Sequence, residues 1–218
     1  MRGLFITVEG PDGSGKSSLV KELSHQLEKI LAVPLVITRE PGGSEIAEKI
    51  REVIIDPNHR EMDHRTEALL FAASRRQHVI EKINPALDAG KVVLCDRFVD
   101  SSIAYQGAGR EIGVEEVRGI NEFATGKLEP DLTLYLDVDA QIGLNRIESK
   151  ESNREKDRLE LEAVTFHNRV RSAYLNLLKE NPNRIHLVDA SQQKKTVLKD
   201  SLMIVEKELE ALKLVKNT

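Results

Sequence analysis

A glycine-rich stretch near the start of the chain combines three glycines with a lysine and a serine. Residues 8–20 read VEGPDGSGKSSLV, and within them the spacing G-x-x-x-x-G-K-[ST] is met. Glycines at this spacing let backbone N–H groups turn toward phosphate oxygens, and the start of a following helix adds positive potential. We expect Lys16 to reach the β- and γ-phosphates of a nucleotide and the Ser17 hydroxyl to reach Mg²⁺. The residues predicted to hold the nucleotide here are Gly10, Pro11, Asp12, Gly13, Ser14, Gly15, Lys16, Ser17 and Ser18.

A loop of this kind leaves the reaction open. Switch GTPases, motor ATPases and small-molecule kinases all use it. The sequence contains no N-K-x-D motif for reading guanine, and 218 residues are few for a motor with separate coupling elements. These features favour a small-molecule kinase, and they leave open which nucleotide or nucleoside it would phosphorylate; a nucleotide-binding switch without transfer activity is the alternative.

Charged residues follow a later apolar run, in LCDRFVDSSIAYQG. Asp96 closes the run, where a carboxylate can act on Mg²⁺ directly or through water. Arg97 comes next, at the carboxyl edge of a predicted strand, where open α/β sheets bind their ligands. A structural ion pair between the two is the alternative. If the following stretch is helical, Ser102, Tyr105 and Gln106 share one face and could read a base and a sugar, or form an ordinary polar surface.

An earlier predicted helix carries RTEALLFAASRRQHV. Phe71 and Arg75 are four residues apart and so lie on one face of it. The ring could stack on a base and the guanidinium could donate to a carbonyl oxygen. The alternative is a core phenylalanine with an arginine that reaches past it to solvent. The turn TREPGGSE opens a helix that carries Arg51, and the pattern leaves open whether Arg51 points inward.

The elements that must position these residues alternate along the chain. Short apolar runs typical of strands covered on both faces span 4–9, 34–38, 91–96, 132–138 and 184–190. Helix-length segments lie at 16–32, 44–56, 65–89, 114–126, 139–149, 158–180 and 193–213. The alternation predicts an α/β fold with three layers, in which a parallel sheet of about five strands carries helices on both faces. No linker divides the chain, so we expect one domain over residues 1–218.

Composition narrows the function classes. The net charge is −4, with 32 basic and 36 acidic side chains and no basic tail, which argues against a nucleic-acid binder. No apolar run approaches the roughly 18 residues of a membrane span. The single cysteine, Cys95, rules out a disulfide within the chain. These features indicate a cytoplasmic protein without a membrane partner.

The order of these blocks resembles the bacterial thymidylate kinase family. The match runs from about residue 3 to residue 190 and rests on the phosphate-binding loop, REPGG, TEALLFAASRRQH, CDRFVDSSIAYQG and EPDLTLYLDV. The loop alone marks a superfamily, whereas DRFVDSSIAYQG and LLFAASRRQH are much more specific. The resemblance implies a phosphate-loop kinase fold with a short lid, a homodimer, and transfer of the γ-phosphoryl group of ATP-Mg²⁺ to dTMP, a step in dTTP synthesis.

The resemblance also implies roles in base recognition. Phe71 would stack on thymine, Arg75 and Gln106 would hydrogen-bond its polar edge, and Ser102 would line the same pocket. Tyr105 would crowd the place of a ribose 2′-hydroxyl and so favour deoxyribose.

Further implied roles concern the sugar, the phosphate and adenine. Asp12 would face the sugar 3′-hydroxyl, and Arg51 and Arg97 would hold the acceptor phosphate. Glu40 and Pro41 would border the pocket. Near adenine, the resemblance places Arg146 and residues 189–192.

The charged segment ESKESNREKDRLELE, residues 148–162, reads from composition as a solvated helix junction. Some members of the family carry a basic residue in the phosphate-binding loop, where this chain has Gly13. The resemblance therefore implies that a lid, about residues 146–160, supplies the catalytic arginine, with Arg154 and Arg158 as the candidates.

Overall fold

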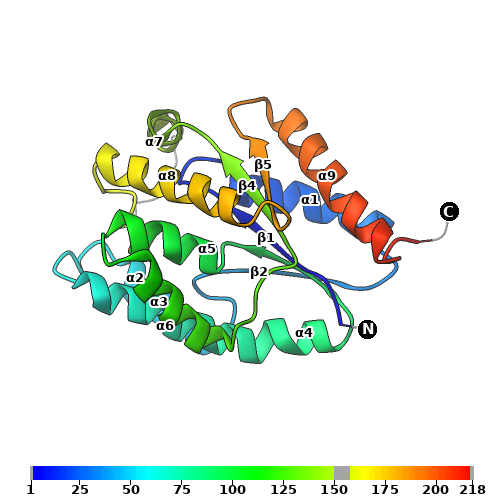
Figure 1. Cartoon of the computed structure of the whole chain (residues 1–218), viewed down its shortest axis with the longest axis horizontal. Coiled ribbons are helices and arrows are strands. Elements are labelled where there is room, and N and C mark those ends of the chain that lie inside the picture. Colours follow the sequence, from blue (N-terminus) through cyan, green and yellow to red (C-terminus); the bar gives the residue numbers. More distant parts are fainter. Residues whose placement is uncertain (1, 150–157, 217–218) are drawn as a thin grey trace.

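A sheet of five parallel strands forms the centre of the computed structural model, which describes residues 2–149 and 158–216 (Figure 1). The strand order is β2-β3-β1-β4-β5. This confirms the expected α/β fold with a parallel sheet. The strands are β1 Phe5–Glu9, β2 Leu35–Arg39, β3 Val92–Asp96, β4 Leu132–Asp137 and β5 Ile185–Asp189.

Both faces of the sheet are buried over the central strands β1, β3 and β4, as their near-continuous apolar runs predict, whereas the edge strands β2 and β5 are partly exposed. Successive side chains alternate between the faces. Ile6 and Leu94 belong to one hydrophobic cluster, whereas Phe5 and Val93 belong to another. Because β1 and β3 pair in register at these positions, each face presents a continuous apolar surface to the helices that cover it.

Helices cover the two faces (Figure 1). α1 (Lys16–Ile30) and α9 (Lys194–Ala211) pack side by side and share one cluster with the sheet. α8 (Val164–Glu180) packs with the helical stretch after β3 on another cluster. The remaining helices are α2 Glu45–Ile55, α3 His64–His78, α4 Asn84–Asp88, α5 Val99–Ser102, α6 Val114–Thr125 and α7 Ala140–Ser149.

Two expected helices differ in detail. The segment 65–89 is α3 and α4 joined by a wider π-type turn at Val79–Ile83. The helix expected over 158–180 begins only at Val164, because residues 158–162 form turns whose first residue bonds back to the backbone of α2. The stretch after β3 is helical, with α5 continuing into a π-type segment at Ile103–Gly109.

None of the helices within residues 2–149 and 158–216 is long and apolar enough to cross a membrane.

Candidate active site

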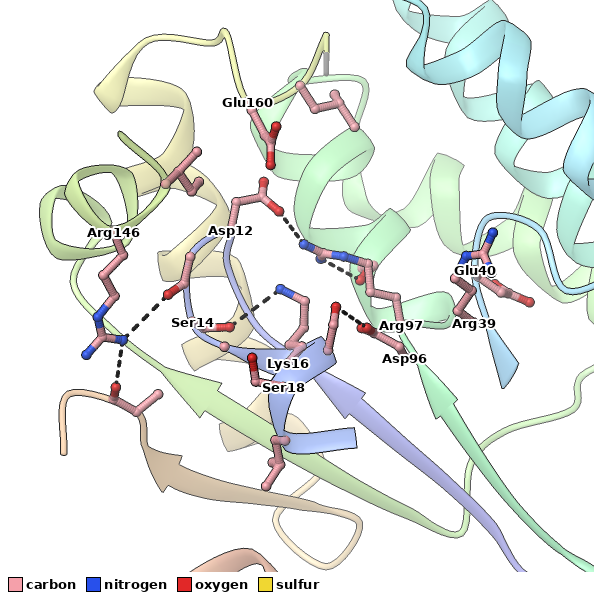
Figure 2. A pocket seen from close by; sticks show the side chains of 18 of the residues that line it. Asp12, Ser14, Lys16, Ser18, Arg39, Glu40, Asp96, Arg97, Arg146 and Glu160 are labelled. Atoms are coloured by element: carbon pink, nitrogen blue, oxygen red, sulfur yellow. Dashed lines mark hydrogen bonds and ion pairs between the residues drawn. The ribbon is translucent and has the colours of Figure 1, made fainter. Parts of the chain in front are cut away.

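A pocket of about 840 Å³ opens at the carboxyl ends of β1 and β3 (Figure 2). Its lining runs from the phosphate-binding loop after β1 to Phe71 on α3. This volume is within the usual range for ligand sites. At its floor Ser17 Oγ donates to Asp96 Oδ2 over 2.7 Å, so the structure brings together the two residues expected near Mg²⁺.

Lys16 lies folded into the phosphate-binding loop. Its Nζ donates to Gly10 O at 2.9 Å and Pro11 O at 2.8 Å. Burial, with the nearby Arg97 guanidinium, lowers the pKa of Lys16 to about 8. An arriving phosphate would compensate this buried cation, so the loop is an anion site by charge as well as by shape.

The backbone conformation and the close packing at position 13 require a glycine. Its φ is +75°, and a Cβ there would lie 2.0 Å from Gly143 O on α7. A Cβ on Gly143 would in turn lie 2.4 Å from Asp12 O. The loop and α7 therefore meet backbone to backbone, and any side chain at position 13 would force the two apart.

Arg97 links the loop to the acceptor end of the pocket. Its Nη2 lies 2.5 Å from Asp12 Oδ1 and 3.1 Å from Tyr105 Oη, and Tyr105 Oη donates to Asp12 Oδ2 at 2.8 Å. Burial acts to raise the pKa of Asp12, but Arg97 and Lys16 outweigh it and lower that pKa. The Arg97 backbone has φ +70°, an unfavourable conformation for a residue with a Cβ, which is typical of a functional position held by its neighbours.

Glu9 supplies part of that support from below. This buried carboxylate accepts hydrogen bonds from Phe98 N at 2.7 Å, Ser101 Oγ at 2.5 Å and Tyr174 Oη at 2.8 Å. Burial, reinforced by the charge of Asp100, raises the pKa of Glu9 to about 7. The sequence interpretation missed Glu9, although its place at the end of a buried strand, directly before the phosphate-binding loop, was a usable signal.

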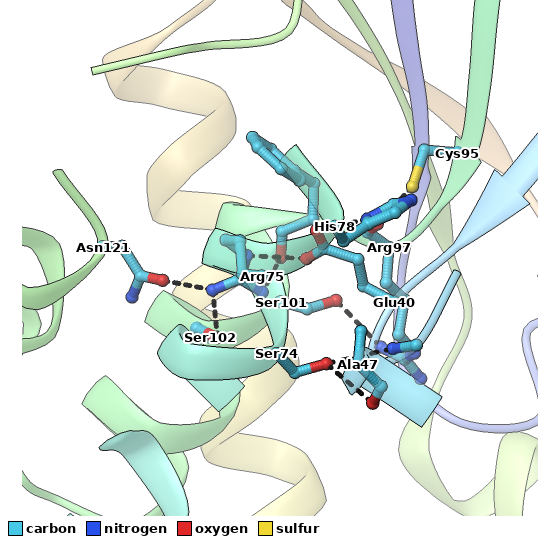
Figure 3. A network of polar contacts seen from close by, with 12 residues as sticks. Glu40, Ala47, Ser74, Arg75, His78, Cys95, Arg97, Ser101, Ser102 and Asn121 are labelled. Carbon is cyan, nitrogen blue, oxygen red and sulfur yellow. Dashed lines mark hydrogen bonds and ion pairs between the residues drawn. The ribbon is translucent and has the colours of Figure 1, made fainter. Parts of the chain in front are cut away.

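Arg75 is fixed by contacts from four different segments (Figure 3). Its Nε donates to Glu40 Oε2 at 2.6 Å, and Nη2 donates to Phe98 O at 3.0 Å. Nη1 donates to Ser102 Oγ at 2.9 Å and to Asn121 Oδ1. These bonds use four of the five N–H groups of a guanidinium, and Arg75 also lines the pocket.

His78 braces the same carboxylate from its other side (Figure 3). His78 Nδ1 lies 2.9 Å from Glu40 Oε1, and Nε2 lies 2.7 Å from Thr38 Oγ1. Because the Glu40 carboxylate accepts, Nδ1 carries the proton that it shares. We did not predict His78 from the sequence, although Phe71, Arg75 and His78 follow helical spacing on α3.

The remaining base-reading candidate, Gln106, also lines the pocket. Its Nε2 donates to Glu67 Oε1 at 2.7 Å. Glu67 is fully buried and was missed as well, although it lies four residues before Phe71 on the same helix face.

Two further arginines border the pocket. Arg51 lines it and donates from Nη1 to Pro41 O at 3.0 Å. Arg146 on α7 donates from Nη1 to Ala190 O at 2.9 Å, so it lies beside the loop expected near adenine. That loop also contributes Gln192 to the lining.

Arg158, one of the two candidate lid arginines, lies away from the phosphate-binding loop. Arg158 is buried, and its Nη2 lies 2.5 Å from Glu67 Oε2 while its Nε donates to Ile54 O at 3.2 Å. It borders a second cavity rather than the phosphate-binding loop. Arg154 and most of the expected lid lie outside the described residues.

Within the described part of the chain, no group of three or more His, Cys, Asp and Glu side chains could hold a metal alone. The oxygens of Ser17 and Asp96 nevertheless suit Mg²⁺, which commonly takes one or two protein ligands and completes its shell with phosphates and water.

Comparison with known proteins gives one consistent result. The family model described as thymidylate kinase matches residues 8–201. The chain is 59% identical over 192 residues to a thymidylate kinase of Lacticaseibacillus casei, covering 88% of this chain and 90% of that protein. It is 50% identical over 214 residues to one of Bacillus velezensis, covering 98% and 100%. The crystal structure of thymidylate kinase from Ehrlichia chaffeensis matches with a TM-score of 0.77 at 31% identity, covering 94% of this chain and all of that one.

Proposed function

The chain belongs to the thymidylate kinase family, and we propose that it transfers the γ-phosphoryl group of ATP to dTMP, giving dTDP and ADP. The observation that carries the proposal is a single pocket that joins the phosphate-binding loop to the Phe71, Arg75 and Gln106 cluster. Arg97 and Arg51 line the same pocket. A phosphorylated nucleotide seated at the cluster would face the tip of the triphosphate.

Repulsion between the acceptor phosphate and the triphosphate is the main barrier to this reaction. An acceptor phosphate carries nearly two negative charges, and two unit charges about 4 Å apart repel by about 4 kcal/mol at an effective dielectric of about 20. Lys16, Arg51 and Arg97 are placed to offset this repulsion without water, which would compete as acceptor. The attacking oxygen is already anionic, so positioning and charge stabilisation suffice and no general base is needed.

Ser17 and Asp96 would hold Mg²⁺ with the ATP phosphates, where the ion would neutralise charge on the β- and γ-oxygens. The Ser17–Asp96 hydrogen bond of 2.7 Å keeps both oxygens at one place.

The base and sugar would be read by the other end of the pocket. Phe71 offers a ring for stacking, and Arg75 and Gln106 offer polar groups. Tyr105, held by Asp12 and Arg97, would crowd a 2′-hydroxyl and so select deoxyribose.

We propose that the lid, about residues 146–160, supplies a catalytic arginine, Arg154 or Arg158. Arg158 would first have to leave Glu67 and Ile54, where the structure places it. Glu67 would keep Arg110 and Gln106 as partners, since both contact it independently.

The test is a panel of nucleosides and monophosphates incubated with Mg-ATP while ADP release is followed. Activity confined to dTMP is the expected result. Equal activity on UMP or CMP would favour a kinase of broader or different specificity, and nucleotide binding without any phosphorylated product would favour a switch.

The assembly is also part of the proposal. We expect a homodimer formed through α2, α3 and α6, in which α3 packs against the other two (Figure 1). Each of the three helices exposes large apolar side chains. Phe123 is 90% exposed and Leu69 57%. Sedimentation should show a dimer that Phe123→Glu weakens. We further propose that residues 1–218 form one domain, because one sheet contains all five strands of the described residues. We also propose that the enzyme is cytoplasmic, in keeping with a cysteine that is free and buried.

A further inference from the structure

We propose that Glu67 is a specificity-determining residue that orients the Gln106 amide so that its oxygen, and not its NH₂ group, faces the base. The inference rests on the proposed function, since it concerns how the same pocket selects one pyrimidine. Glu67 would act through Gln106 without touching the substrate.

The Glu67 carboxylate is buried and surrounded by donors. Its Oε1 accepts from Gln106 Nε2 at 2.7 Å and from Arg110 Nε at 3.3 Å. Its Oε2 lies 2.5 Å from Arg158 Nη2 and 3.1 Å from Arg110 Nη2. Arg110 contacts both oxygens, so it holds the carboxylate in one position even when Arg158 leaves, and Oε1 keeps its contact with Gln106.

The orientation of the Gln106 amide follows from this contact. A carboxylate paired with the Arg110 guanidinium only accepts hydrogen bonds, so the NH₂ group of Gln106 must face it. A flipped amide would set two acceptor oxygens against each other in a site where Glu67 is 0% exposed and Gln106 1% exposed. Leaving a buried polar pair unsatisfied in this way disfavours the flip by about tenfold to hundredfold.

The amide oxygen is then available to a ligand. Among the described residues, Gln106 makes no side-chain hydrogen bond except that to Glu67, and it lines the pocket. Arg75 lines the same pocket and offers only donors. One acceptor beside one donor matches the N3–H and O4 of thymine, whereas cytosine presents an acceptor at N3 and an amino donor at position 4.

The test compares dTMP with 5-methyl-dCMP, whose base has the shape of thymine but the opposite donor and acceptor pattern. The readout is the ratio of kcat/KM for the two substrates. We expect the unmodified protein to prefer dTMP by at least about 100-fold. In Glu67→Gln, the new amide can point its oxygen at the Nη2 atoms of Arg110 and Arg158 and its NH₂ at Gln106, which would turn Gln106 over. The ratio should then fall by about tenfold to hundredfold.

Glu162→Gln is the matched control, because Glu162 Oε1 lies 2.5 Å from Arg110 Nη1 in the same cluster but does not contact Gln106. It should change the ratio by less than about threefold. A fall in the ratio no larger for Glu67→Gln than for Glu162→Gln would overturn the inference.

Two outcomes separate this inference from the proposed function. If the unmodified protein forms no dTDP from dTMP, the proposed function fails; if it does so and only the Glu67→Gln ratio is unchanged, the inference alone fails. Should Glu67→Gln not fold, the unmodified protein decides: a strong preference for dTMP supports the amide orientation, and equal turnover of 5-methyl-dCMP refutes it.

Discussion

Replacing Glu9 with glutamine should change how the stability of the protein depends on pH. Glu9 lies beneath the phosphate-binding loop with its carboxylate removed from water. Asp100 faces it with a like charge, while Arg97, Ser101 and Tyr174 favour its ionised form. Burial dominates, so the pKa rises from 4.5 to about 7.

The direction of the effect follows from proton binding. Between pH 4.5 and pH 7 the folded protein keeps a proton on Glu9 that the unfolded chain has lost, so stability falls as the pH rises through this window. The pKa difference corresponds to about 3 kcal/mol once Glu9 is fully ionised. The glutamine side chain of the variant cannot ionise, yet its amide oxygen can still accept from Phe98 N, so this contribution to the pH dependence should vanish.

The assay is urea unfolding of both proteins at pH 5, 6, 7 and 8. The free energy of unfolding of the unmodified protein, minus that of Glu9→Gln, should fall by about 2–3 kcal/mol from pH 5 to pH 8. Glu115→Gln is the control, since Glu115 is 79% exposed on α6. The difference in the free energy of unfolding between the unmodified protein and this variant should not change with pH. A difference for Glu9→Gln that is constant across this range would refute the reasoning.

Three further substitutions test the site by steady-state kinetics with each substrate varied. Lys16→Ala should lower kcat by at least about 10²-fold, because it removes a cation from the phosphates, and a change under threefold would contradict its role. His78→Leu removes the donor that braces Glu40 and, through it, Arg75, so KM for dTMP should rise about tenfold while KM for ATP stays constant; equal rises in both would indicate general misfolding instead. Arg158→Ala should lower kcat by about 10³-fold, far more than it raises KM for dTMP, and near-normal turnover would remove the lid assignment.

The types and spacing of neighbouring residues were enough to predict the part of the site that binds the nucleotide phosphates. The phosphate-binding loop is contiguous, and its strand, turn and helix follow one another, so residue types and spacing describe it almost completely. The position of Asp96 could also be predicted, because the last residue of a parallel strand lies at the carboxyl end of the sheet, where ligands bind. The short apolar runs, alternating with helix-length segments, similarly predicted the parallel sheet.

The partners of the base-reading residues depended on the tertiary structure. Periodicity on α3 shows that Phe71 and Arg75 share a face, but not that Glu40, directly after β2, and Asn121 from α6 would hold Arg75. Likewise, Glu67 meets Gln106 and Arg158 across 39 and 91 residues of chain. Such contacts arise from how helices pack on the sheet, and residue spacing within one helix carries no information about which side chains another helix will present to it.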